Sequence, residues 1–208
     1  MKNAGRKHQP PTEDEVTTMC GRFSVSGGMF SEIVSEEIGC VFKAEENLDL
    51  RPSQTVSTII YVQGSVEQQD VHWGIHPNWA KKQIINAQAE TVNEKKTFHH
   101  AMQNHRCLIP CSGWFEWHDE GAPRKQKYLF SHQDERPFYM AGIWFPGDTP
   151  QLVTLTTAAN EICRPYHDRM PVLIPTKSAW KWLEDNITAI TPLLKVNNKL
   201  PITVTAVH

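Results

Sequence analysis

The sequence lacks any apolar run of about 18 residues, the length that a membrane-spanning helix requires. Residues 1–18 are polar and lack the apolar segment of a secretory signal peptide. These two absences argue against a membrane protein and against export, so no membrane partner is expected. We predict a cytoplasmic protein, associated with the nucleoid if the cell is bacterial.

The sequence also lacks a marked excess of either charge. Its 21 Lys and Arg residues are balanced by 23 Asp and Glu residues, which gives a formal net charge of −2. A strongly basic chain would indicate a nucleic-acid partner from composition alone, and this chain does not. Any anion-binding surface must therefore be a local patch of cations.

Cysteines with the spacing of a disulfide framework or a zinc site are lacking as well. The five cysteines are odd in number and irregularly spaced, which is typical of a reducing compartment. Cys107 and Cys111 form one C-x3-C pair, but no second pair completes the four ligands of a structural zinc site. We therefore predict no metal and no cofactor.

The remaining composition indicates one globular domain, residues 19–208, preceded by a segment without a core. Of the 208 residues 39% are hydrophobic and seven are tryptophan, which suffices for a sizeable core. Residues 1–18 carry charges of both signs and no apolar periodicity. We expect them to be a disordered leader, a tag or a mis-called start.

Apolar spacing predicts many strands and few helices. Helices are predicted at 29–38, at 93–104 and from Thr176 to about Asp185, the last with Trp180 and Leu183 facing inward. Strands are predicted at 55–62, 66–73, 84–91, 106–110, 113–118, 127–132, 137–145, 151–157 and 171–174, with a last short strand near the C-terminus. The predicted fold class is α+β, a single domain on a curved, barrel-like, mainly antiparallel sheet with a few flanking helices.

The dipeptide Met19-Cys20 has a chemical use that an internal cysteine lacks. If the mature chain begins after Met19, Cys20 carries a free α-amine beside its thiol. The amine condenses with an aldehyde to an imine, and the thiol closes on the imine carbon to give a thiazolidine. An α-amine titrates near pH 8, so part of it is neutral and nucleophilic in the cell. The alternative is an internal, half-buried cysteine that acts as a small hydrophobe.

Three further polar residues stand in unusual contexts. Glu116 lies between aromatic residues in a predicted strand, where an apolar setting would raise a carboxyl pKa toward neutrality. The alternative for Glu116 is a solvated, outward-facing position. Asn86 lies in a predicted strand although Asn is depleted in strands. His167 precedes Asp168 and Arg169, and its alternative is a loop or core histidine.

Tryptophans Trp73, Trp79 and Trp114 have two possible uses. They either pack in the core or stack on nucleobases of a single strand.

Taken together, eight ordered segments from Met19 to about Pro175 closely resemble the SOS response-associated peptidase family, whose SRAP domains crosslink to abasic sites. The matching segments are Met19-Cys20-Gly21-Arg22-Phe23, Pro52-x-Gln54, Trp73-Gly74-x-x-Pro77-x-Trp79, Asn86-Ala87-x-x-Glu90-Thr91, Cys107-Leu108-Ile109-Pro110, Gly113-Trp114-Phe115-Glu116-Trp117, Ala141-Gly142-Ile143-Trp144 and His167-Asp168-Arg169-Met170-Pro171. The resemblance implies a mixed domain with a barrel-like sheet and a basic groove for DNA.

The resemblance also implies roles for individual residues. Cys20 resembles the mature N-terminal residue that bonds to an abasic site in single-stranded DNA, and Asn86 the residue that positions its amine. Glu116 is similar to the general acid and base, and His167 to the residue that assists sugar opening and reversal of the crosslink. The implied DNA-binding residues are Arg22, Pro52, Trp79, Gln88, Thr156 and Arg169.

Two positions depart from the family pattern. Gln88 stands where the family has an arginine, so a phosphate-binding charge is lost. Asp49 stands where the family has an asparagine, which adds a negative charge near the expected groove. Both changes bear on DNA affinity rather than on aldehyde chemistry.

Two other functions stay open from the sequence. One is a thiol autopeptidase in which Cys20 removes its own leader with help from Glu116 and His167. The other is a non-covalent reader of single-stranded or modified DNA. The expected partner is single-stranded DNA containing abasic sites, and the expected state is a monomer.

Overall fold

The computed structural model describes residues 21–207, so Met19, Cys20 and the predicted leader lie outside the described residues. The described strands are β1 (Phe23–Val25), β2 (Asn47–Leu50), β3 (Thr55–Val62), β4 (Ser65–Trp73), β5 (Asn86–Gln88), β6 (Arg106–Cys111), β7 (Gly113–His118), β8 (Gln126–His132), β9 (Phe138–Phe145), β10 (Gln151–Ala158), β11 (Arg169–Pro171) and β12 (Ile202–Val207). The described helices are α1 (Phe30–Ile38), α2 (Lys96–Asn104), α3 (Ala179–Glu184) and α4 (Ile187–Ile190), with the 3-10 turns η2 (Thr176–Ser178) and η3 (Thr191–Leu194).

Five strands close on themselves to form a barrel. Strand β10 pairs with β4, β4 with β3, β3 with β6, β6 with β9, and β9 again with β10. Only the β10–β4 pair of this ring is parallel. Because closure removes the exposed sheet edges, the strands need few covering helices. The predicted α+β class with a barrel-like, mainly antiparallel sheet is confirmed.

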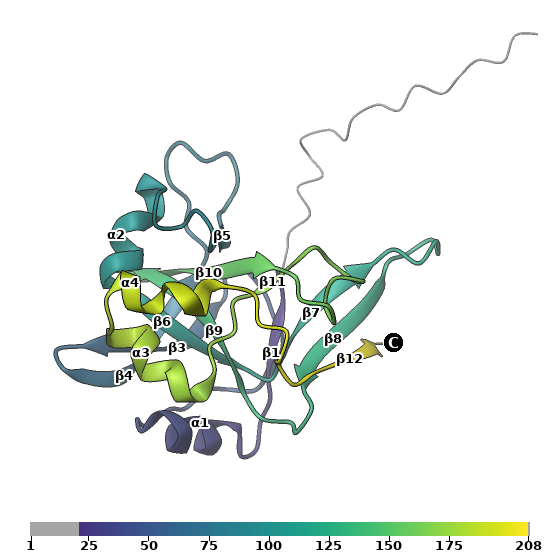
Figure 1. The fold of residues 1–208 in the computed structure, drawn as a ribbon, viewed down its shortest axis with the longest axis horizontal. Coiled ribbons are helices and arrows are strands. Elements are labelled where there is room, and N and C mark those ends of the chain that lie inside the picture. The colour runs from purple at the N-terminus through teal and green to yellow at the C-terminus, as the bar shows by residue number, and fades with distance from the viewer. Residues whose placement is uncertain (1–20, 208) are drawn as a thin grey trace, which may run out of the picture.

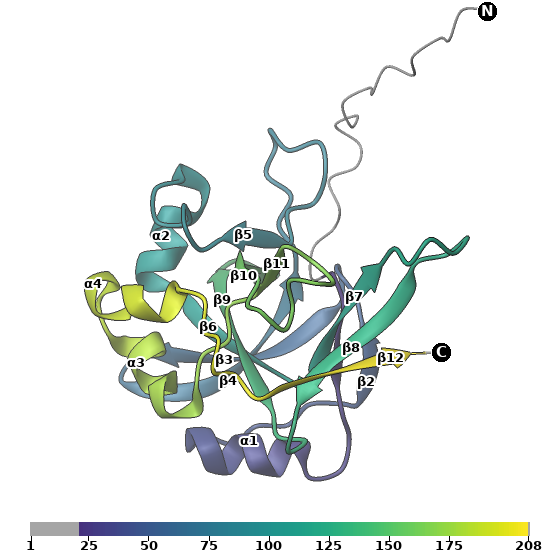
Figure 2. The same cartoon turned by 45° about the vertical axis from the view of Figure 1, so that its right-hand side comes forward.

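Two short strands extend the barrel at one end of β10. Strand β5 runs parallel to β10 and pairs Asn86 with Thr154 and Gln88 with Thr156. Strand β11 runs antiparallel on β10 and pairs Ala158 with Arg169. Residues from three distant segments therefore meet at this end (Figure 2).

A second sheet has the order β12-β8-β7-β1-β2. The β7–β8 hairpin projects from the body of the molecule (Figure 1). Gly113 begins β7 where a Cβ atom would lie only 2.3 Å from the carbonyl oxygen of Phe130, so no larger residue fits there. That close approach lets the hairpin strands pair and lets Trp114 stack on Phe130 with ring centroids 5.0 Å apart.

The helices cover the barrel on one side and below (Figure 1). In α1 the residues at helical spacing, Phe30, Val34 and Ile38, are buried, which confirms the helix predicted at 29–38. None of the described helices is both long enough and apolar enough to span a bilayer.

The last predicted helix differs from the observed one. A 3-10 turn occupies Thr176–Ser178 and the α-helix starts only at Ala179, which shifts the helical phase. Trp182 now faces the core and donates its indole N–H to the Cys107 carbonyl over 2.9 Å. Trp180, predicted to face inward, is 45% exposed instead. Leu183 is buried as predicted.

Candidate functional site

The described chain begins beside strand β7. Phe23 pairs with Trp114 in the antiparallel register, and the Phe115 amide donates to the Arg22 carbonyl over 3.0 Å. The same register, continued by one residue, sets Gly21 opposite Glu116. The first described residues therefore lie next to the carboxyl-bearing part of β7.

Glu116 is buried, with only 4% of its surface exposed, so the solvated outward position is excluded. Strand alternation places Trp114 and Glu116 on one face of β7 and Phe115 and Trp117 on the other. The Lys127 ammonium confirms the second face, since it lies 3.9 Å from the Phe115 ring centroid and 5.5 Å from that of Trp117. We expected the aromatic neighbours of Glu116 to enclose its carboxyl. Phe115 and Trp117 do not, because their side chains lie on the opposite face of β7.

The burial of Glu116 involves the loop between β10 and β11. Tyr166 in that loop packs on the β7–β8 hairpin, with ring centroids 4.6 Å from Tyr128 and 5.4 Å from Phe130. Cys163 lies close enough to Glu116 for their charges to interact, and burial together with the Glu116 carboxylate raises the pKa of the Cys163 thiol to about 12. The loop thus joins β7 to the β10–β11 end of the barrel.

Asn160 gives this loop its shape. The Cys163 amide donates to the Asn160 side-chain oxygen over 2.9 Å, and the Arg164 amide donates to the Asn160 carbonyl over 2.9 Å. These bonds form one helical turn with Asn160 as its cap. The turn ends where the His167 amide donates to the Cys163 carbonyl over 3.1 Å.

The His167 ring is held by its own backbone neighbourhood. The Arg169 amide donates to His167 Nδ1 over 3.0 Å, and Asp168 Oδ1 also lies 3.0 Å from Nδ1. A backbone N–H always donates, so Nδ1 accepts and the neutral ring carries its proton on Nε2. Asp168 can pair with Nδ1 only when that nitrogen is protonated, and its side chain is 88% exposed. The backbone bond therefore orients the ring.

Asn86 occupies strand β5 because a neighbouring hydroxyl satisfies its amide. The Thr154 hydroxyl donates to the Asn86 side-chain oxygen and also lies 3.1 Å from the Ile85 carbonyl. Asn86 is half-buried at the barrel end described above. Thr154 of β10 therefore sets the orientation of the Asn86 side-chain amide.

Arg169 forms a two-point ion pair with Glu90 at this end of the barrel. Its two terminal nitrogens each donate to one Glu90 oxygen over 2.8 Å, a bidentate geometry. One of them also donates to the Thr156 carbonyl over 2.7 Å and lies 3.2 Å from the Thr156 hydroxyl. The Arg169 hydrogen bond and charge lower the Glu90 pKa against the effect of burial. Thr156 is fully buried, whereas Gln88 beside it is exposed.

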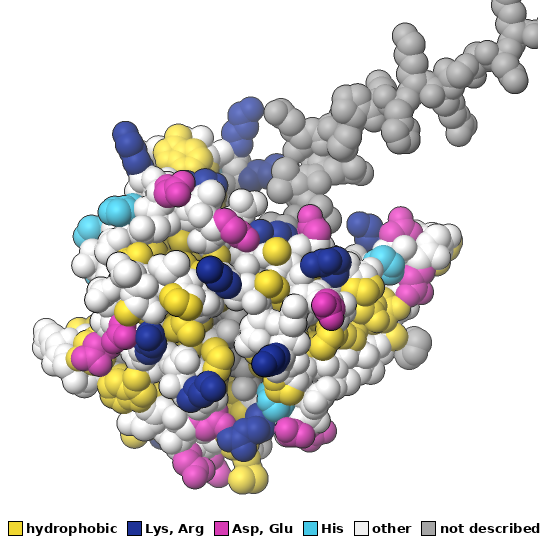
Figure 3. All heavy atoms as spheres, in the orientation of Figure 1, with side chains coloured by type: hydrophobic (Ala, Val, Ile, Leu, Met, Phe, Trp, Pro, Cys, Tyr) yellow, Lys and Arg dark blue, Asp and Glu magenta, His cyan; other side chains and the backbone are white. Residues whose placement is uncertain are grey.

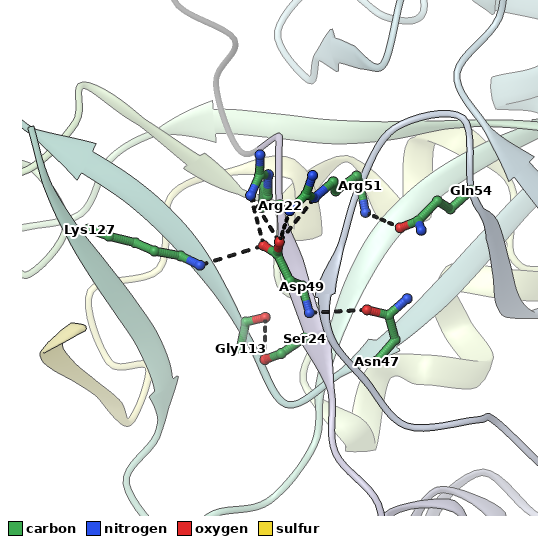
Figure 4. Close-up of polar contacts among 8 residues, drawn as sticks. All are labelled: Arg22, Ser24, Asn47, Asp49, Arg51, Gln54, Gly113 and Lys127. Atoms are coloured by element: carbon green, nitrogen blue, oxygen red, sulfur yellow. Dashed lines mark hydrogen bonds and ion pairs between the residues drawn. The ribbon is translucent and has the colours of Figure 1, made fainter. Parts of the chain in front are cut away.

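Asp49 gathers three cations on the neighbouring sheet (Figure 4). Arg22 donates to both carboxylate oxygens over 3.0 Å, and Arg51 donates to one oxygen over 3.0 Å and 2.5 Å. Lys127 Nζ lies 3.5 Å from the other oxygen. Burial opposes ionisation of Asp49, but the bonds from Arg51 and Arg22 outweigh it and lower the pKa of Asp49. We call Asp49, Arg22, Arg51 and Lys127 the Asp49 cluster.

Sequence reasoning named Arg22 but missed Arg51 and Lys127 as members of this cluster. Residues 22, 51 and 127 are far apart in the chain, and only the pairing of β1 with β2 and β7 brings their strands together. The two-residue spacing of Asp49 and Arg51, which places both side chains on one face of an extended segment, was an available signal for Arg51.

The loop between β4 and β5 projects from the barrel (Figure 2). Trp73 is buried and donates its indole N–H to the Ile85 carbonyl over 3.1 Å. Gly74, with φ 110°, turns the chain outward, and an Ile75–Ile84 bridge closes the loop. Trp79 in the loop is 68% exposed. Of the three tryptophans that had two possible uses, Trp73 and Trp114 are therefore core residues and Trp79 is not.

Basic residues flank Trp79 in the same loop. Lys81 and Lys82 are exposed, and Figure 3 shows apolar and basic side chains together over the loop that rises above β5. Pro52 lies at the base of the loop in a turn fixed by Ser53, whose amide donates to the Trp73 carbonyl over 2.8 Å.

The described residues contain no group of three or more His, Cys, Asp or Glu side chains that could hold a metal ion. A cavity of about 580 Å³ lies against Asn47, Thr55 and Asp70, and none of the candidate site residues lines it.

The fold and the site together define a class: a small α+β barrel domain with a buried carboxyl beside the start of its first strand. Residues 19–208 match the family model described as "SOS response associated peptidase (SRAP)", so the chain belongs to that family.

Curated relatives and solved structures agree with this assignment. The chain is 30% identical over 185 residues to "Abasic site processing protein YoqW" of Bacillus subtilis, which covers 82% of each chain. It is 28% identical over 185 residues to "Abasic site processing protein YedK" of Escherichia coli, again with 82% of each chain covered. A crystal structure from Bordetella bronchiseptica aligns with a TM-score of 0.78 and 22% identity over 91% of this chain and 100% of that one. A second, from Bacteroides thetaiotaomicron, has a TM-score of 0.74, 24% identity and coverage of 89% and 92%. The two structures support the fold alone.

Proposed function

We propose that this protein bonds covalently to abasic sites in single-stranded DNA through Cys20, after residues 1–19 have been removed. The relatives named as abasic site processing proteins support this assignment. The observation that carries it is the position of Arg22. Its carbonyl accepts from the Phe115 amide, so the chain segment directly after Cys20 lies beside buried Glu116.

The other cysteines are poor nucleophiles in this fold. Burial raises the pKa of the thiols of Cys40, Cys107, Cys111 and Cys163. A thiol held in its protonated form reacts slowly with electrophiles. Cys20 is therefore the thiol to which the chemistry is assigned.

The proposed reaction balances without a cofactor. A ring-opened abasic sugar is an aldehyde, and the neutral Cys20 amine adds to its carbon to give a carbinolamine. Glu116 donates a proton to the carbinolamine hydroxyl, which leaves as water, and an iminium ion remains. The Glu116 carboxylate then takes the thiol proton while sulfur bonds to the iminium carbon. The products are a thiazolidine, one water and the regenerated acid.

Two neighbours of this step have proposed roles. Asn86 holds the Cys20 amine, since Thr154 fixes the orientation of the Asn86 amide. His167 transfers a proton when the sugar opens and when the crosslink reverses, because its ring is oriented with Nε2 as the donor. Positioning of this kind raises the effective concentration of the reacting groups over that of a free aminothiol.

DNA binding is assigned to residues around the same centre. Arg22 contacts a phosphate, and Trp79 stacks on an unpaired base as exposed aromatics do in single-strand binders. Pro52 and Gln88 line the path of the strand. Arg169 contributes less phosphate attraction than Arg22, because Glu90 pairs with Arg169 alone whereas Arg22 shares Asp49 with two other cations.

Thr156 is proposed to position Arg169 on this surface. Its buried hydroxyl lies within hydrogen-bond distance of Arg169. We propose that the protein acts as a monomer on one DNA strand.

A second activity, hydrolysis of the Met19–Cys20 bond by the protein itself, is compatible with this proposal. The printed sequence carries 19 residues before Cys20, and the free amine requires their removal. Initiation at Met19 followed by loss of that methionine would give the same mature end.

Intact mass spectrometry tests the proposed function. The purified protein is incubated with an oligonucleotide that has one abasic site, or with the same oligonucleotide carrying thymine instead. We expect a species with the mass of protein starting at Cys20 plus abasic oligonucleotide minus one water, and none with thymine. A heat- and denaturant-sensitive complex alone would support the non-covalent reader instead.

A further inference from the structure

The Asp49 cluster contains more positive charge than its carboxylate neutralises. Arg22, Arg51 and Lys127 surround a single acid, which leaves two cations in excess. The chain as a whole is slightly acidic, with a net charge of −2. A local excess of this kind is therefore the sort of patch that an anionic ligand requires here.

Contacts with aromatic rings restrict the side chains of two cations in the cluster. The Arg22 guanidinium lies 5.4 Å from the Trp117 ring centroid, and Lys127 lies over both Phe115 and Trp117. Aromatic faces on one side and a shared carboxylate on the other hold Arg22 and Lys127 in place, whereas among the described residues Arg51 is held by Asp49 alone. Preorganised donors bind an anion without the entropy cost of first being ordered.

The cations keep donors beyond those that Asp49 uses. A guanidinium has five N–H donors in a planar fork. The contacts to Asp49 use only Nη1 of Arg22, and only Nε and Nη2 of Arg51. The Arg51 side chain is 56% exposed, so a ligand can reach it from solvent.

The position of the cluster relates it to the proposed reaction. Arg22 is two residues from Cys20, and two residues span at most about 7 Å. The backbone of Arg22 is therefore close to the reacting end of the chain, and an anion bound by its side chain would lie within one arginine length of that backbone. In an abasic strand the anion at that distance from the reacting sugar is a flanking phosphodiester.

We infer that Arg51 and Lys127 join Arg22 in a binding site for the phosphate that flanks the abasic sugar, and that Asp49 positions these three cations. The inference rests on the proposed function. It assigns to the Asp49 cluster the phosphate contact that Gln88, which stands at an arginine position of the family pattern, cannot make.

Non-covalent binding tests the site without requiring the crosslink. The affinity of the protein for an unmodified single-stranded oligonucleotide is measured across a range of salt for wild type, Arg51→Gln and Lys127→Gln. Arg136→Gln is the matched control, because Arg136 is also an exposed cation and pairs with one acid, Glu37 of α1. We expect each cluster variant to bind on the order of 3- to 10-fold more weakly and to lose up to about 0.7 from the log–log salt slope. Arg51→Lys should restore the slope.

Crosslinking rate tests the positioning role of Asp49. Asp49→Asn keeps the shape and adds net positive charge, so mere neutralisation would leave the rate at saturating DNA unchanged. Positioning predicts equal or tighter binding of the unmodified oligonucleotide, but a maximal crosslinking rate at least about 10-fold lower, because the phosphate is held in the wrong place. The melting temperature of each variant is measured beside it, and Asp49→Glu serves as the second variant that retains the carboxylate.

The outcomes separate the two levels of the proposal. If wild type crosslinks but Arg51→Gln and Lys127→Gln bind like Arg136→Gln, the phosphate site is wrong and the proposed function stands. If Asp49→Asn keeps the wild-type maximal rate, Asp49 is not a positioning residue. If wild type binds no single-stranded DNA, both the site and the proposed function fail.

Discussion

The Phe115 amide and the Arg22 carbonyl are joined by a hydrogen bond of 3.0 Å, and this bond sets the start of the chain against β7. Glu116 follows Phe115 directly and turns to the opposite face of the strand, where it is buried. The strand thus presents two surfaces near one chain end. The Phe115 side carries the Asp49 cluster, and the Glu116 side faces the loop that holds His167.

Glu116→Gln should slow crosslinking by about 10²–10⁴-fold while leaving the final yield largely intact. Glutamine keeps the shape and hydrogen-bonding capacity of the side chain but cannot transfer the proton that the carbinolamine hydroxyl needs. The Cys20 aminothiol still reacts without help, only slowly. Single-turnover rates on an abasic oligonucleotide measure the effect.

Because Glu116 is buried, a change in stability is the rival explanation for a slower variant. The melting temperature must therefore be recorded with each rate, and exposed Glu67→Gln on β4 provides a matched control. A folded Glu116→Gln protein that crosslinks at the wild-type rate would make Glu116 a structural carboxylate.

His167→Ala should slow the reaction on an abasic sugar that is mostly in its closed form. It should matter much less for a substrate already held as an open aldehyde, because the ring-opening step is then absent. The comparison of the two substrates is the measurement. An equal loss on both would assign His167 to a later step or to the packing of its loop.

DNA binding should be modest and sensitive to salt. About three or four phosphate contacts on a single strand give a log–log slope of about −2 to −3. Gln88→Arg should steepen the slope and tighten binding, since Gln88 is exposed on β5. Gln133→Arg adds the same charge at another exposed position and serves as control. An unchanged slope for Gln88→Arg would show that this position does not face the phosphates.

The Arg169–Glu90 pair should make the free energy of unfolding depend on pH in the acidic range. The Arg169 hydrogen bonds lower the Glu90 pKa from its ordinary value of 4.5, so the folded protein binds this proton more weakly than the unfolded chain. The resulting stabilisation is present above pH 4.5 and is lost as the pH falls through the lowered value. Glu90→Gln should remove this part of the pH dependence and cost about 1 kcal/mol at neutral pH, or about 2–4 °C in melting temperature.

Denaturant unfolding between pH 3 and 7 checks this expectation, with Glu67→Gln as control. A wild-type curve that declines below about pH 4.5 no more steeply than that of Glu90→Gln would contradict it.

The barrel and most of its strands could be predicted from the sequence, because period-two apolar spacing reports directly on strand faces. The helix phase at Trp180 could not, since a 3-10 turn over Thr176–Ser178 changes the phase without changing the apolar residues. The strand predicted at 171–174 is found at Arg169–Pro171, because pairing with β10 rather than local propensity sets its bounds. Contacts between residues that are far apart in the sequence were the hardest feature to predict.

The candidate site shows the same limit. The family resemblance selected Glu116, Asn86 and His167. The sequence did not reveal that Glu116 lies near Cys163 on a distant loop, on the face of β7 opposite Phe115 and Trp117. Asp49 was expected to place an unfavourable charge near the groove. Its contacts with Arg22 and two further cations depend on strand pairing that the sequence does not reveal.

The central claim is that a free N-terminal Cys20 forms the bond to DNA. Top-down mass spectrometry of the crosslinked species tests it most directly, because one spectrum gives both the first residue and the site of attachment. The account predicts a chain that starts at Cys20 with the DNA on that residue, no crosslink for Cys20→Ala, and at most a weaker, reversible imine for Cys20→Ser. A stable crosslink on a chain that still carries Met19 would contradict the thiazolidine mechanism.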